Sequence, residues 1–334
     1  MLNLLMIGAS GTISSAVLRQ ALAAGHQVTV LQRHPEAALA GLSCPVETLT
    51  ADIRDEAEVR QLLQNRQFDA AVDFVVFNEK DASRDIRLLQ HNCRQYVFIS
   101  SASAYHKPVR RLPIDESVPL NNPYWAYSRA KQAAEACLLS AWQEQAFPVT
   151  IVRPSHTYGP RSMPMALHGA NGSYQNLERM LQDQPVIVPG DGESLWTLTW
   201  ADDFAVGLVG LLGQTAALGE AFHITSDEAL TWNEIYAAIG RALGVKPKLV
   251  HVASDTLIRL RPELEGPLLG DKAVCAVFDN RKIRRFVPAF QPAVRFEQGA
   301  VRVWDWLSQH PEACKRDPEF DQWCDQVLQR LDRL

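Results

Sequence analysis

A tyrosine and a lysine four residues apart, Tyr127 and Lys131, form the pair in this chain that is best suited to proton transfer. Positions i and i+4 lie on one face of a helix, so the phenol and the ammonium would point into the same space. A nearby lysine charge favours the phenolate and lowers the pKa of a tyrosine towards the range of a general acid or base. Because this spacing also occurs by chance in many helices, the assignment depends on the residues that precede it.

Three serines, Ser100, Ser101 and Ser103, follow a short apolar run that predicts a buried strand. Ligands of open α/β sheets bind beyond the carboxyl ends of the strands. A serine at such a position can donate a hydrogen bond to a substrate oxygen as charge develops on that oxygen. The alternative for each of the three is an ordinary turn serine.

Two glycines, Gly8 and Gly11, come directly after the first predicted strand and open the first predicted helix. Glycines at such a turn let backbone N–H groups approach a pyrophosphate, and the helix N-terminus supplies favourable potential. The third glycine position of this kind of motif is Ser14, which is small enough for close helix–strand packing. We therefore expect a dinucleotide site here; the alternative is a structural turn without a ligand.

The residues after the second and third predicted strands bear on the choice of cofactor. The second strand ends in Gln32 and Arg33, without the acidic residue that would bind the ribose hydroxyls. Arg33 could accept a 2′-phosphate, which slightly favours NADP over NAD, or it could be a solvated surface residue. Asp52, next to Ile53, could receive the adenine amino group; its alternative is a helix N-cap, for which Asp55 is better placed.

Strands and helices alternate over the first half of the chain, which predicts a doubly wound parallel sheet of the Rossmann type. Near-continuous apolar strands fit a sheet that is buried on both faces. The predicted strands are Leu2–Ile7, Gln27–Leu31, Val46–Thr50, Ala70–Val75, Gln95–Ser100 and Val149–Val152. The predicted helices are Thr12–Ala24, Glu56–Asn65, Asp81–His91 and Tyr124–Gln145.

After about residue 160 the pattern loosens and glycine and proline become more frequent. Helices are predicted at Ala201–Leu212, at Trp232–Leu243 with Thr231 as N-cap, and at Ala293–Leu307, with another in the tail Pro318–Leu334. We expect a dinucleotide-binding Rossmann domain over residues 1–160, to which the segment near 196–225 returns. Residues 161–334 are expected to form mainly a smaller C-terminal α/β substrate-binding region with C-terminal helices.

The composition is that of an ordinary globular protein, with 334 residues, 47% hydrophobic and 21% charged. A net charge of −5 argues against a general binder of polyanions such as nucleic acids. The six cysteines are scattered and no apolar run approaches the ~20 residues that span a bilayer, so we expect a cytoplasmic protein without a membrane partner. No cluster of His, Cys or Asp has metal-ligand spacing, and we expect no metal.

Taken together and in this order, the motifs resemble the extended branch of the short-chain dehydrogenase/reductase superfamily, which includes NAD(P)-dependent sugar epimerases and dehydratases. The resemblance covers about residues 1–310, and the ordered combination is highly specific. The matching elements are Gly8-x-x-Gly11-x-x-Ser14, Asp52, Ser101, Tyr127-x-x-x-Lys131 and Arg153-Pro154-x-x-x-Tyr158-Gly159-Pro160.

The resemblance implies roles for individual residues. Tyr127 would be the acid/base, Lys131 would bind the nicotinamide ribose and lower the tyrosine pKa, and Ser101 would orient the substrate oxygen. The implied homodimer would form through the predicted helices Asp81–His91 and Tyr124–Gln145. The cofactor contacts would be Gly8, Gly11, Thr12, Ile13, Arg33, Asp52, Ile53, Lys131 and Pro154.

The implied reaction is reversible hydride transfer at a hydroxyl or ketone carbon. The Tyr127 phenolate would remove the hydroxyl proton as hydride leaves the same carbon for the nicotinamide. Reversal on the other face of the ketone gives epimerisation, whereas stopping halfway gives dehydrogenation or reduction. Dehydration is disfavoured because Ala102 and Ser103 follow Ser101, where dehydratases of this branch often carry an acidic pair.

Two departures from the pattern concern the substrate. His156 replaces an asparagine, and Trp196 an arginine, with which nucleotide-sugar enzymes of this branch hold the diphosphate. An arginine can clamp a diphosphate, whereas a tryptophan stacks on a sugar or base or fills the core. We expect a carbohydrate-type substrate without a nucleotide diphosphate, or one held differently. The candidate substrate contacts are Ser103, His156, Tyr158 and Trp196, with a purely structural histidine as the alternative for His156.

The sequence thus predicts an NAD(P)-dependent epimerase or dehydrogenase that acts on a sugar-like substrate. The alternative is a non-catalytic dinucleotide-binding regulator or RNA-associated protein of the same fold. The complete set of Ser101, Tyr127 and Lys131 and the acidic net charge argue against this alternative.

Overall fold

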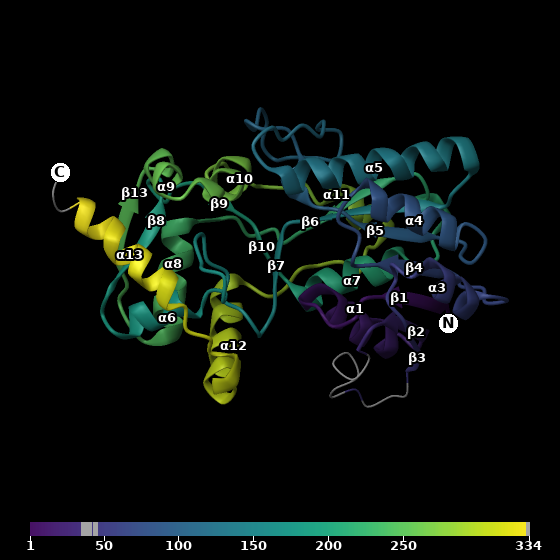
Figure 1. Ribbon diagram of the computed structural model, residues 1–334, viewed down its shortest axis with the longest axis horizontal. Coiled ribbons are helices and arrows are strands. Elements are labelled where there is room, and N and C mark those ends of the chain that lie inside the picture. Colours follow the sequence, from purple (N-terminus) through teal and green to yellow (C-terminus); the bar gives the residue numbers. More distant parts are fainter. Residues whose placement is uncertain (35–41, 43–45, 332–334) are drawn as a thin grey trace.

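A parallel sheet covered by helices forms the larger part of the protein, as predicted (Figure 1). It has seven strands, one more than the six predicted, because β11 joins it at the edge. The computed structural model describes residues 1–34, 42 and 46–331. The strand order is β11-β6-β5-β4-β1-β2-β3, and every neighbouring pair is parallel. The strands are β1 (Asn3–Ile7), β2 (Gln27–Gln32), β3 (Glu47–Thr50), β4 (Ala70–Asp73), β5 (Tyr96–Ile99), β6 (Val149–Pro154) and β11 (Ala221–Ile224).

Helices cover both faces of this sheet, because alternate side chains of each strand face opposite layers. Leu4 and Met6 of β1 pack with α1 and α7, whereas Leu5 and Ile7 pack with α3, α4 and α5. A short helix, α11, joins the α1 side through Ile283. The bounds are α1 (Thr12–Ala23), α3 (Glu56–Leu63), α4 (Glu79–Leu89), α5 (Ala126–Gln145), α7 (Ala201–Leu211) and α11 (Arg281–Phe286).

Side-chain hydrogen bonds move some boundaries away from the predicted ones. Strand β4 ends at Asp73 rather than at Val75, because the Asp73 carboxylate accepts the Val75 N–H at 2.6 Å and turns the chain. Helix α4 begins earlier than predicted because Asn78 caps it by accepting the Asp81 N–H at 3.1 Å. The predicted cap Asp55 is confirmed at the start of α3.

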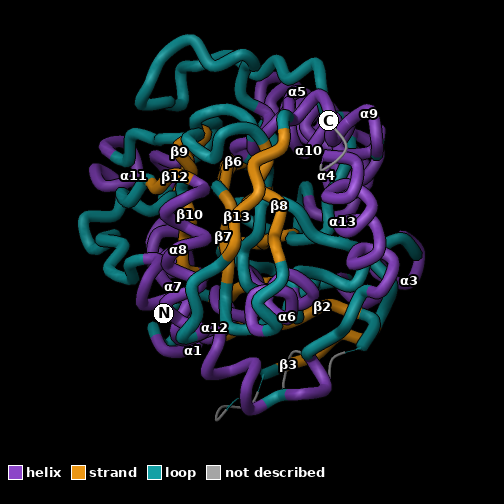
Figure 2. The backbone as a smooth tube through the Cα atoms, turned by 90° about the vertical axis from the view of Figure 1, so that its left-hand side faces the viewer, coloured by secondary structure: helices purple, strands orange, loops and turns teal. Residues whose placement is uncertain are grey.

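The second half of the chain builds a smaller region around three two-stranded sheets (Figure 2). The sequence did not predict these strands, because runs of two to five residues carry no clear period. The sheets pair β7 (His156–Tyr158) with β10 (Leu198–Trp200), β9 (Leu195–Trp196) with β12 (Leu230–Thr231), and β8 (Pro185–Pro189) with β13 (Lys248–Val252). The helices of this smaller region are α6 (Tyr174–Leu181), α8 (Trp232–Leu243), α9 (Ser254–Leu260), α10 (Glu265–Pro267), α12 (Phe296–Gln309) and α13 (Pro318–Leu331).

Two of these helices show how local and distant contacts set their ends. Helix α8 has the predicted bounds and the predicted Thr231 cap, which accepts the Glu234 N–H. Helix α12 begins at Phe296 instead of Ala293, because the Val294 N–H donates to the carboxylate of Asp203 at 2.9 Å. In the part of the chain that the structure describes, no helix has both the length and the apolar character needed to cross a membrane.

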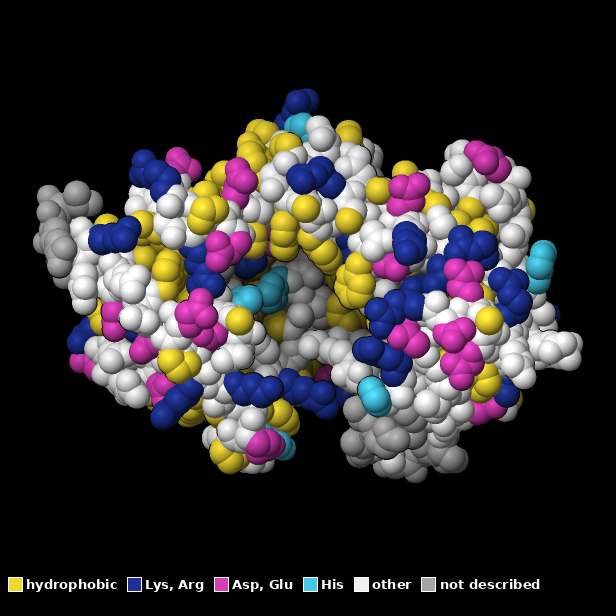
Figure 3. All heavy atoms as spheres, in the orientation of Figure 1, with side chains coloured by type: hydrophobic (Ala, Val, Ile, Leu, Met, Phe, Trp, Pro, Cys, Tyr) yellow, Lys and Arg dark blue, Asp and Glu magenta, His cyan; other side chains and the backbone are white. Residues whose placement is uncertain are grey.

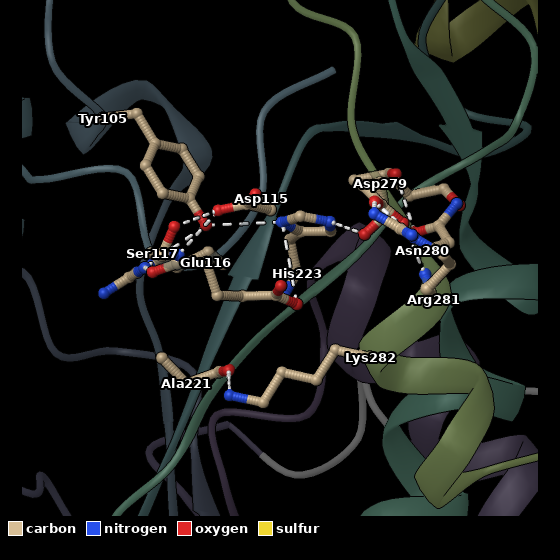
Figure 4. A network of polar contacts seen from close by, with 12 residues as sticks. Tyr105, Asp115, Glu116, Ser117, Ala221, His223, Asp279, Asn280, Arg281 and Lys282 are labelled. Carbon is tan, nitrogen blue, oxygen red and sulfur yellow. Dashed lines mark hydrogen bonds and ion pairs between the residues drawn. The ribbon is translucent and has the colours of Figure 1, made fainter. Parts of the chain in front are cut away.

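The edge of the large sheet at β11 is closed by side chains (Figure 4). The Glu116 carboxylate accepts the backbone N–H of His223 at 3.2 Å, and the Lys282 ammonium donates to the Ala221 carbonyl at 2.8 Å. The buried His223 ring lies between the Tyr105 hydroxyl, at 3.3 Å, and the Asp279 carbonyl. Satisfied edge groups do not pair with further strands, so the sheet ends here.

Candidate active site

The surface is hollowed between the two parts of the molecule, and apolar and histidine side chains lie inside the hollow (Figure 3). Two cavities open beyond the carboxyl ends of the parallel strands, where ligands of such sheets bind. The first, of about 580 Å³, lies over β1, β2 and β4. The second, of about 310 Å³, lies at the end of β5 and the start of α5.

The predicted glycine turn forms the floor of the first cavity. Gly8 has a φ of +77°, and a Cβ added there would lie 2.7 Å from a methyl carbon of Val75, so no larger residue fits without movement. Gly11 precedes the first turn of α1, and its N–H donates to the Ser14 hydroxyl at 2.9 Å. The turn, the helix N-terminus and the adjoining cavity suit a pyrophosphate.

The predicted cofactor residues other than Lys131 fall into three sets. Gly8, Arg33, Asp52 and Ile53 line the first cavity. Pro154 lines the second cavity instead. Gly11, Thr12 and Ile13 lie at the start of α1, outside the walls of both cavities.

Gln32 has a role that the sequence reasoning missed. Its side-chain oxygen accepts the Ala9 N–H at 3.0 Å, and its amide donates to the His34 carbonyl at 2.8 Å. The residue at the usual acidic position therefore braces the glycine turn. The only sequence feature that could have indicated this role of Gln32 is its place as a polar residue at the end of a buried strand.

Asp52 is paired with Arg54 on the wall of the same cavity. Arg54 donates to both carboxylate oxygens, at 2.7 Å from Nη2 and 3.0 Å from Nε, and these bonds lower the pKa of Asp52 to about 2. Asp55, not Asp52, caps the following helix. The Asp52 carboxylate is thus ionised and faces the cavity, where an adenine amino group could donate to it.

Tyr127 and Ser101 meet in the second cavity. Tyr127 lies in the first turn of α5, with its ring 5.0 Å from that of Trp125. Burial raises the pKa of Tyr127, while a hydrogen bond with Ser101 acts in the opposite direction. Lys131 is not among the groups that shift this pKa here, and a lowering of the pKa by Lys131 stays a prediction.

The position of Lys131 bears on that prediction. Its ammonium donates to the backbone carbonyls of Val76 at 2.6 Å and Ile99 at 2.8 Å, and lies 5.8 Å from the centre of the Tyr127 ring. Burial lowers the pKa of Lys131 to about 8. The lysine therefore bridges β5 and the segment after β4, and it makes no hydrogen bond with the Tyr127 hydroxyl.

The three predicted serines take different positions. The Ser101 and Ser103 hydroxyls are 2.8 Å apart, and Ser128 of α5 donates to Ser103 at 2.8 Å. Both Ser101 and Ser103 line the second cavity. Ser100 instead donates to the buried carboxylate of Glu135.

Two of the remaining candidate substrate residues line the second cavity and one does not. Burial and the neighbouring Lys272 lower the pKa of His156 to about 3, so its ring is neutral at physiological pH. Trp196 also lines the cavity, stacked on Trp232 at 5.4 Å. Tyr158 is a correction: it is buried in the core with its ring 5.2 Å from that of Trp200, away from the cavity.

Three charged residues of the second cavity were missed from the sequence. Lys107 comes from the segment before α5, and Asp271 and Lys272 come from a π-helical turn, Leu268–Lys272, far along the chain. None of the three belongs to a motif or a periodic element, so the sequence held no signal for them. Among the residues described, no group of three or more His, Cys, Asp or Glu could hold a metal ion.

Comparisons with known proteins agree on the family. The model of the NAD dependent epimerase/dehydratase family matches residues 4–225, more than half of the chain. A putative UDP-glucose 4-epimerase of Methanocaldococcus jannaschii is 22% identical over 321 residues, which cover 91% of this chain and 98% of the relative. Chloroplast stem-loop binding protein of 41 kDa b of Arabidopsis thaliana is 25% identical over 268 residues, 75% of this chain and 65% of that protein.

A solved structure supports the same fold. UDP-glucuronic acid 4-epimerase from Bacillus cereus, in complex with UDP-glucuronic acid and NAD, matches with a TM-score of 0.74 at 20% identity. The match covers 92% of this chain and 99% of that one. With the family match over residues 4–225, the chain belongs to the NAD-dependent epimerase/dehydratase family.

Proposed function

We propose that this protein catalyses reversible hydride transfer at a hydroxyl or ketone carbon of a sugar-like substrate, with Tyr127 as acid/base. One observation carries the proposal: Ser101 and Tyr127 line the second cavity at the ends of the central strands, beside the first cavity, which suits a dinucleotide. Lys131 lies below the tyrosine, with its ammonium 5.8 Å from the ring centre. Epimerisation, dehydrogenation and reduction all use this arrangement.

Each residue of the site has a separate role in the proposed reaction. A nicotinamide bound beside Pro154 would accept or return the hydride. Ser101 donates a hydrogen bond to the substrate oxygen and orients it. Tyr127 takes the hydroxyl proton during oxidation and returns it during reduction. Because burial raises the pKa of Tyr127, a positive charge brought close to the phenol would be needed to favour its phenolate.

The cofactor is proposed to be NAD or NADP. Arg33 on the cavity wall was the reason for a slight preference for NADP. The Bacillus cereus relative binds NAD, which gives no support to that preference. Titration of the purified protein with each dinucleotide separates the two, since an Arg33 contact with a 2′-phosphate predicts tighter binding of NADP.

The substrate is proposed to lack a nucleotide diphosphate, or to hold it without an arginine clamp. Trp196 is uncharged and stacks on Trp232, and His156 is neutral. Neither can supply the paired charge that a diphosphate requires. Micromolar binding of a nucleoside diphosphate in a calorimetric titration would exclude a substrate without a nucleotide diphosphate.

Replacing Tyr127 with Phe tests the catalytic assignment. The variant keeps the buried ring and loses the proton donor, so we expect dinucleotide affinity within about twofold of wild type and a loss of turnover of at least ~10²-fold. Turnover is measured as the change in redox state of the nicotinamide when candidate sugars are added. Undiminished turnover would show that another group moves the proton.

A non-catalytic dinucleotide-binding regulatory or RNA-associated role is the second candidate, and the name of the Arabidopsis relative agrees with the RNA-associated form of it. The basic residues of α11 do not support it, because several are paired with acids: Arg281 with Asp279, and Lys282 with Glu220. Paired charges attract a polyanion weakly. Redox turnover of bound nicotinamide on addition of sugars would distinguish the enzyme from this alternative.

We also propose a homodimer that forms through α4 and α5. These helices pack on each other and border a surface groove. Its lining includes the small residues Ser83, Ala133, Ala136, Cys137 and Ser140, together with longer side chains at its ends such as Glu79 and Gln145. Small residues on an outer helix face allow the backbone of a second copy to approach closely. This feature supports the expectation that followed from the family resemblance.

A further inference from the structure

Two buried lysines line the cavity beside Tyr127, and the proposed reaction uses neither of them. Lys107 is 3% exposed and Lys272 is 8% exposed. Lysines are almost never buried to this extent unless they are paired. The charges around these two lysines therefore indicate what kind of ligand the cavity binds.

The charges of this cavity do not balance. Asp271 is the one acidic side chain among the described residues of its wall, and its carboxylate lies 3.7 Å from the Lys272 ammonium. Within the part of the chain that the structure describes, the Lys107 ammonium makes no hydrogen bond and no ion pair. His156 adds no charge because its pKa is lowered to about 3. Two cations face one anion, so at least one positive charge is left without a partner.

The turn that carries the second lysine, Lys272, and its partner Asp271 is held in place by the fold. The π-helical turn that carries Asp271 and Lys272 is fastened by Asn122, whose side chain donates to the Gly270 and Ser103 carbonyls at 2.7 Å each. A Cβ on Gly270 would lie 2.9 Å from Cβ of Trp125, so the turn sits directly on the start of α5. Single π-helical turns occur frequently at functional sites.

A buried charge without a partner costs several kcal/mol, and this cost is offset when a ligand supplies the opposite charge. We propose that the substrate is a sugar-sized molecule with one anionic group, a carboxylate or a phosphate, and that this group lies between Lys107 and Lys272. This inference rests on the proposed function. Ser101 and Tyr127 line the same cavity, so the anion and the reacting carbon belong to one small molecule.

The size of the cavity supports a small anionic sugar over a nucleotide sugar. Its volume of about 310 Å³ lies at the lower end of the range for small-molecule sites. Trp196 and its stacking partner Trp232 occupy the side where an arginine clamp would be expected from the family pattern. The anionic group that the two lysines bind is therefore placed on the sugar itself, not on an attached nucleotide.

Calorimetric titration of the full chain with D-glucuronate, glucose 6-phosphate and glucose tests this inference, with and without saturating NAD. The three sugars share a ring size and differ in charge, so the first two separate a carboxylate from a phosphate. We expect at least one of the two anions to bind ~10-fold or more tightly than glucose, because charge-assisted hydrogen bonds in a buried site are strong.

Substitutions then locate the effect. Lys107→Met and Lys272→Met should each weaken anion binding by ~10-fold or more, and Lys107→Arg should retain most of it. The exposed Lys246→Met is the matched control and should change nothing. Because Lys107→Met removes a buried unpaired charge, its Tm without ligand should equal or exceed that of wild type, which shows that the variant is folded.

Several results would overturn the inference: equal binding of glucose and both anions, no binding of either anion at millimolar concentration, or unchanged anion affinity in both lysine variants. Turnover of neutral sugars with no preference for anions would remove this inference and leave the proposed function intact. Lysine-dependent anion binding with no redox change of the nicotinamide would support this inference and contradict the proposed function.

Discussion

At the residue scale, the protonation of Tyr127 depends on which charges lie next to it. Burial raises its pKa, the Ser101 hydrogen bond lowers it, and the neighbouring Asp271 carboxylate raises it. Lys131 is occupied by the carbonyls of Val76 and Ile99. We therefore expect proton removal from the tyrosine to be coupled to binding of the positively charged, oxidised cofactor or to a shift of the lysine.

Gly8 is the residue on which dinucleotide binding should depend most directly. In Gly8→Ala the new Cβ would lie 2.7 Å from Val75, and the residue would have to keep a φ of +77°. We expect NAD affinity to fall by ~10-fold or more, because the displaced turn no longer presents its N–H groups to the pyrophosphate. The measurement is a fluorescence or calorimetric titration with NAD.

Gly25 supplies the matched control for that experiment. It has the same φ of +77°, but no atom lies within 4 Å of its added Cβ. Gly25→Ala should therefore lose only stability, about 1 kcal/mol, and keep the affinity for NAD. Equal loss of affinity in both variants would mean that backbone strain, rather than the turn itself, accounts for the effect.

At the scale of elements, the second cavity depends on a segment that contacts α5 from a distant part of the sequence. Asn122 connects this segment to the serine-bearing turn by donating to the Gly270 and Ser103 carbonyls at 2.7 Å. Its own side-chain oxygen accepts the Tyr124 N–H at 3.1 Å. One buried amide thus aligns the start of α5, the turn after β5 and the π-helical turn.

Replacing Asn122 with Ala should lower the free energy of unfolding by about 1–3 kcal/mol, because it leaves two buried carbonyls without a donor. The neighbouring exposed Asn121→Ala is the control and should stay within about 0.5 kcal/mol of wild type. Urea denaturation of both variants measures the difference. Equal stability of the two variants would show that water or another donor replaces the Asn122 amide.

At the scale of the whole molecule, the proposed dimer makes a prediction about α4 and α5. Ala136 is exposed on α5 beside the groove between the two helices. An arginine there would place a long charged side chain in an interface of small residues, so Ala136→Arg should convert the dimer to a monomer. Light scattering at several protein concentrations gives the mass directly.

Gln322→Arg, on α13 at the opposite end of the molecule, adds the same charge and should leave the mass unchanged (Figure 1). A wild-type mass equal to that of one chain at every concentration would rule out the dimer. So would a dimer in the Ala136→Arg variant that is as stable as that of wild type.

Much of the fold followed from local patterns. The predicted bounds of β1, α1 and α5 lie within two residues of those observed, because apolar periodicity and the glycine turn act locally. The short strands of the smaller region were not predicted, because each is stabilised by its pairing partner. Strand β7, for example, pairs with β10 about forty residues further along the chain.

The sequence by itself determined the α/β class, the glycine turn and the order of Ser101, Tyr127 and Lys131, since each follows from spacing along one element or at one strand end. Only the tertiary structure decided that Lys131 bonds to backbone carbonyls and that Tyr158 lies in the core. It also decided that Lys107 and Lys272 face the Tyr127 cavity. The physical reason is that burial and charge balance depend on chain segments that come into contact only after folding, and local sequence patterns do not predict these contacts.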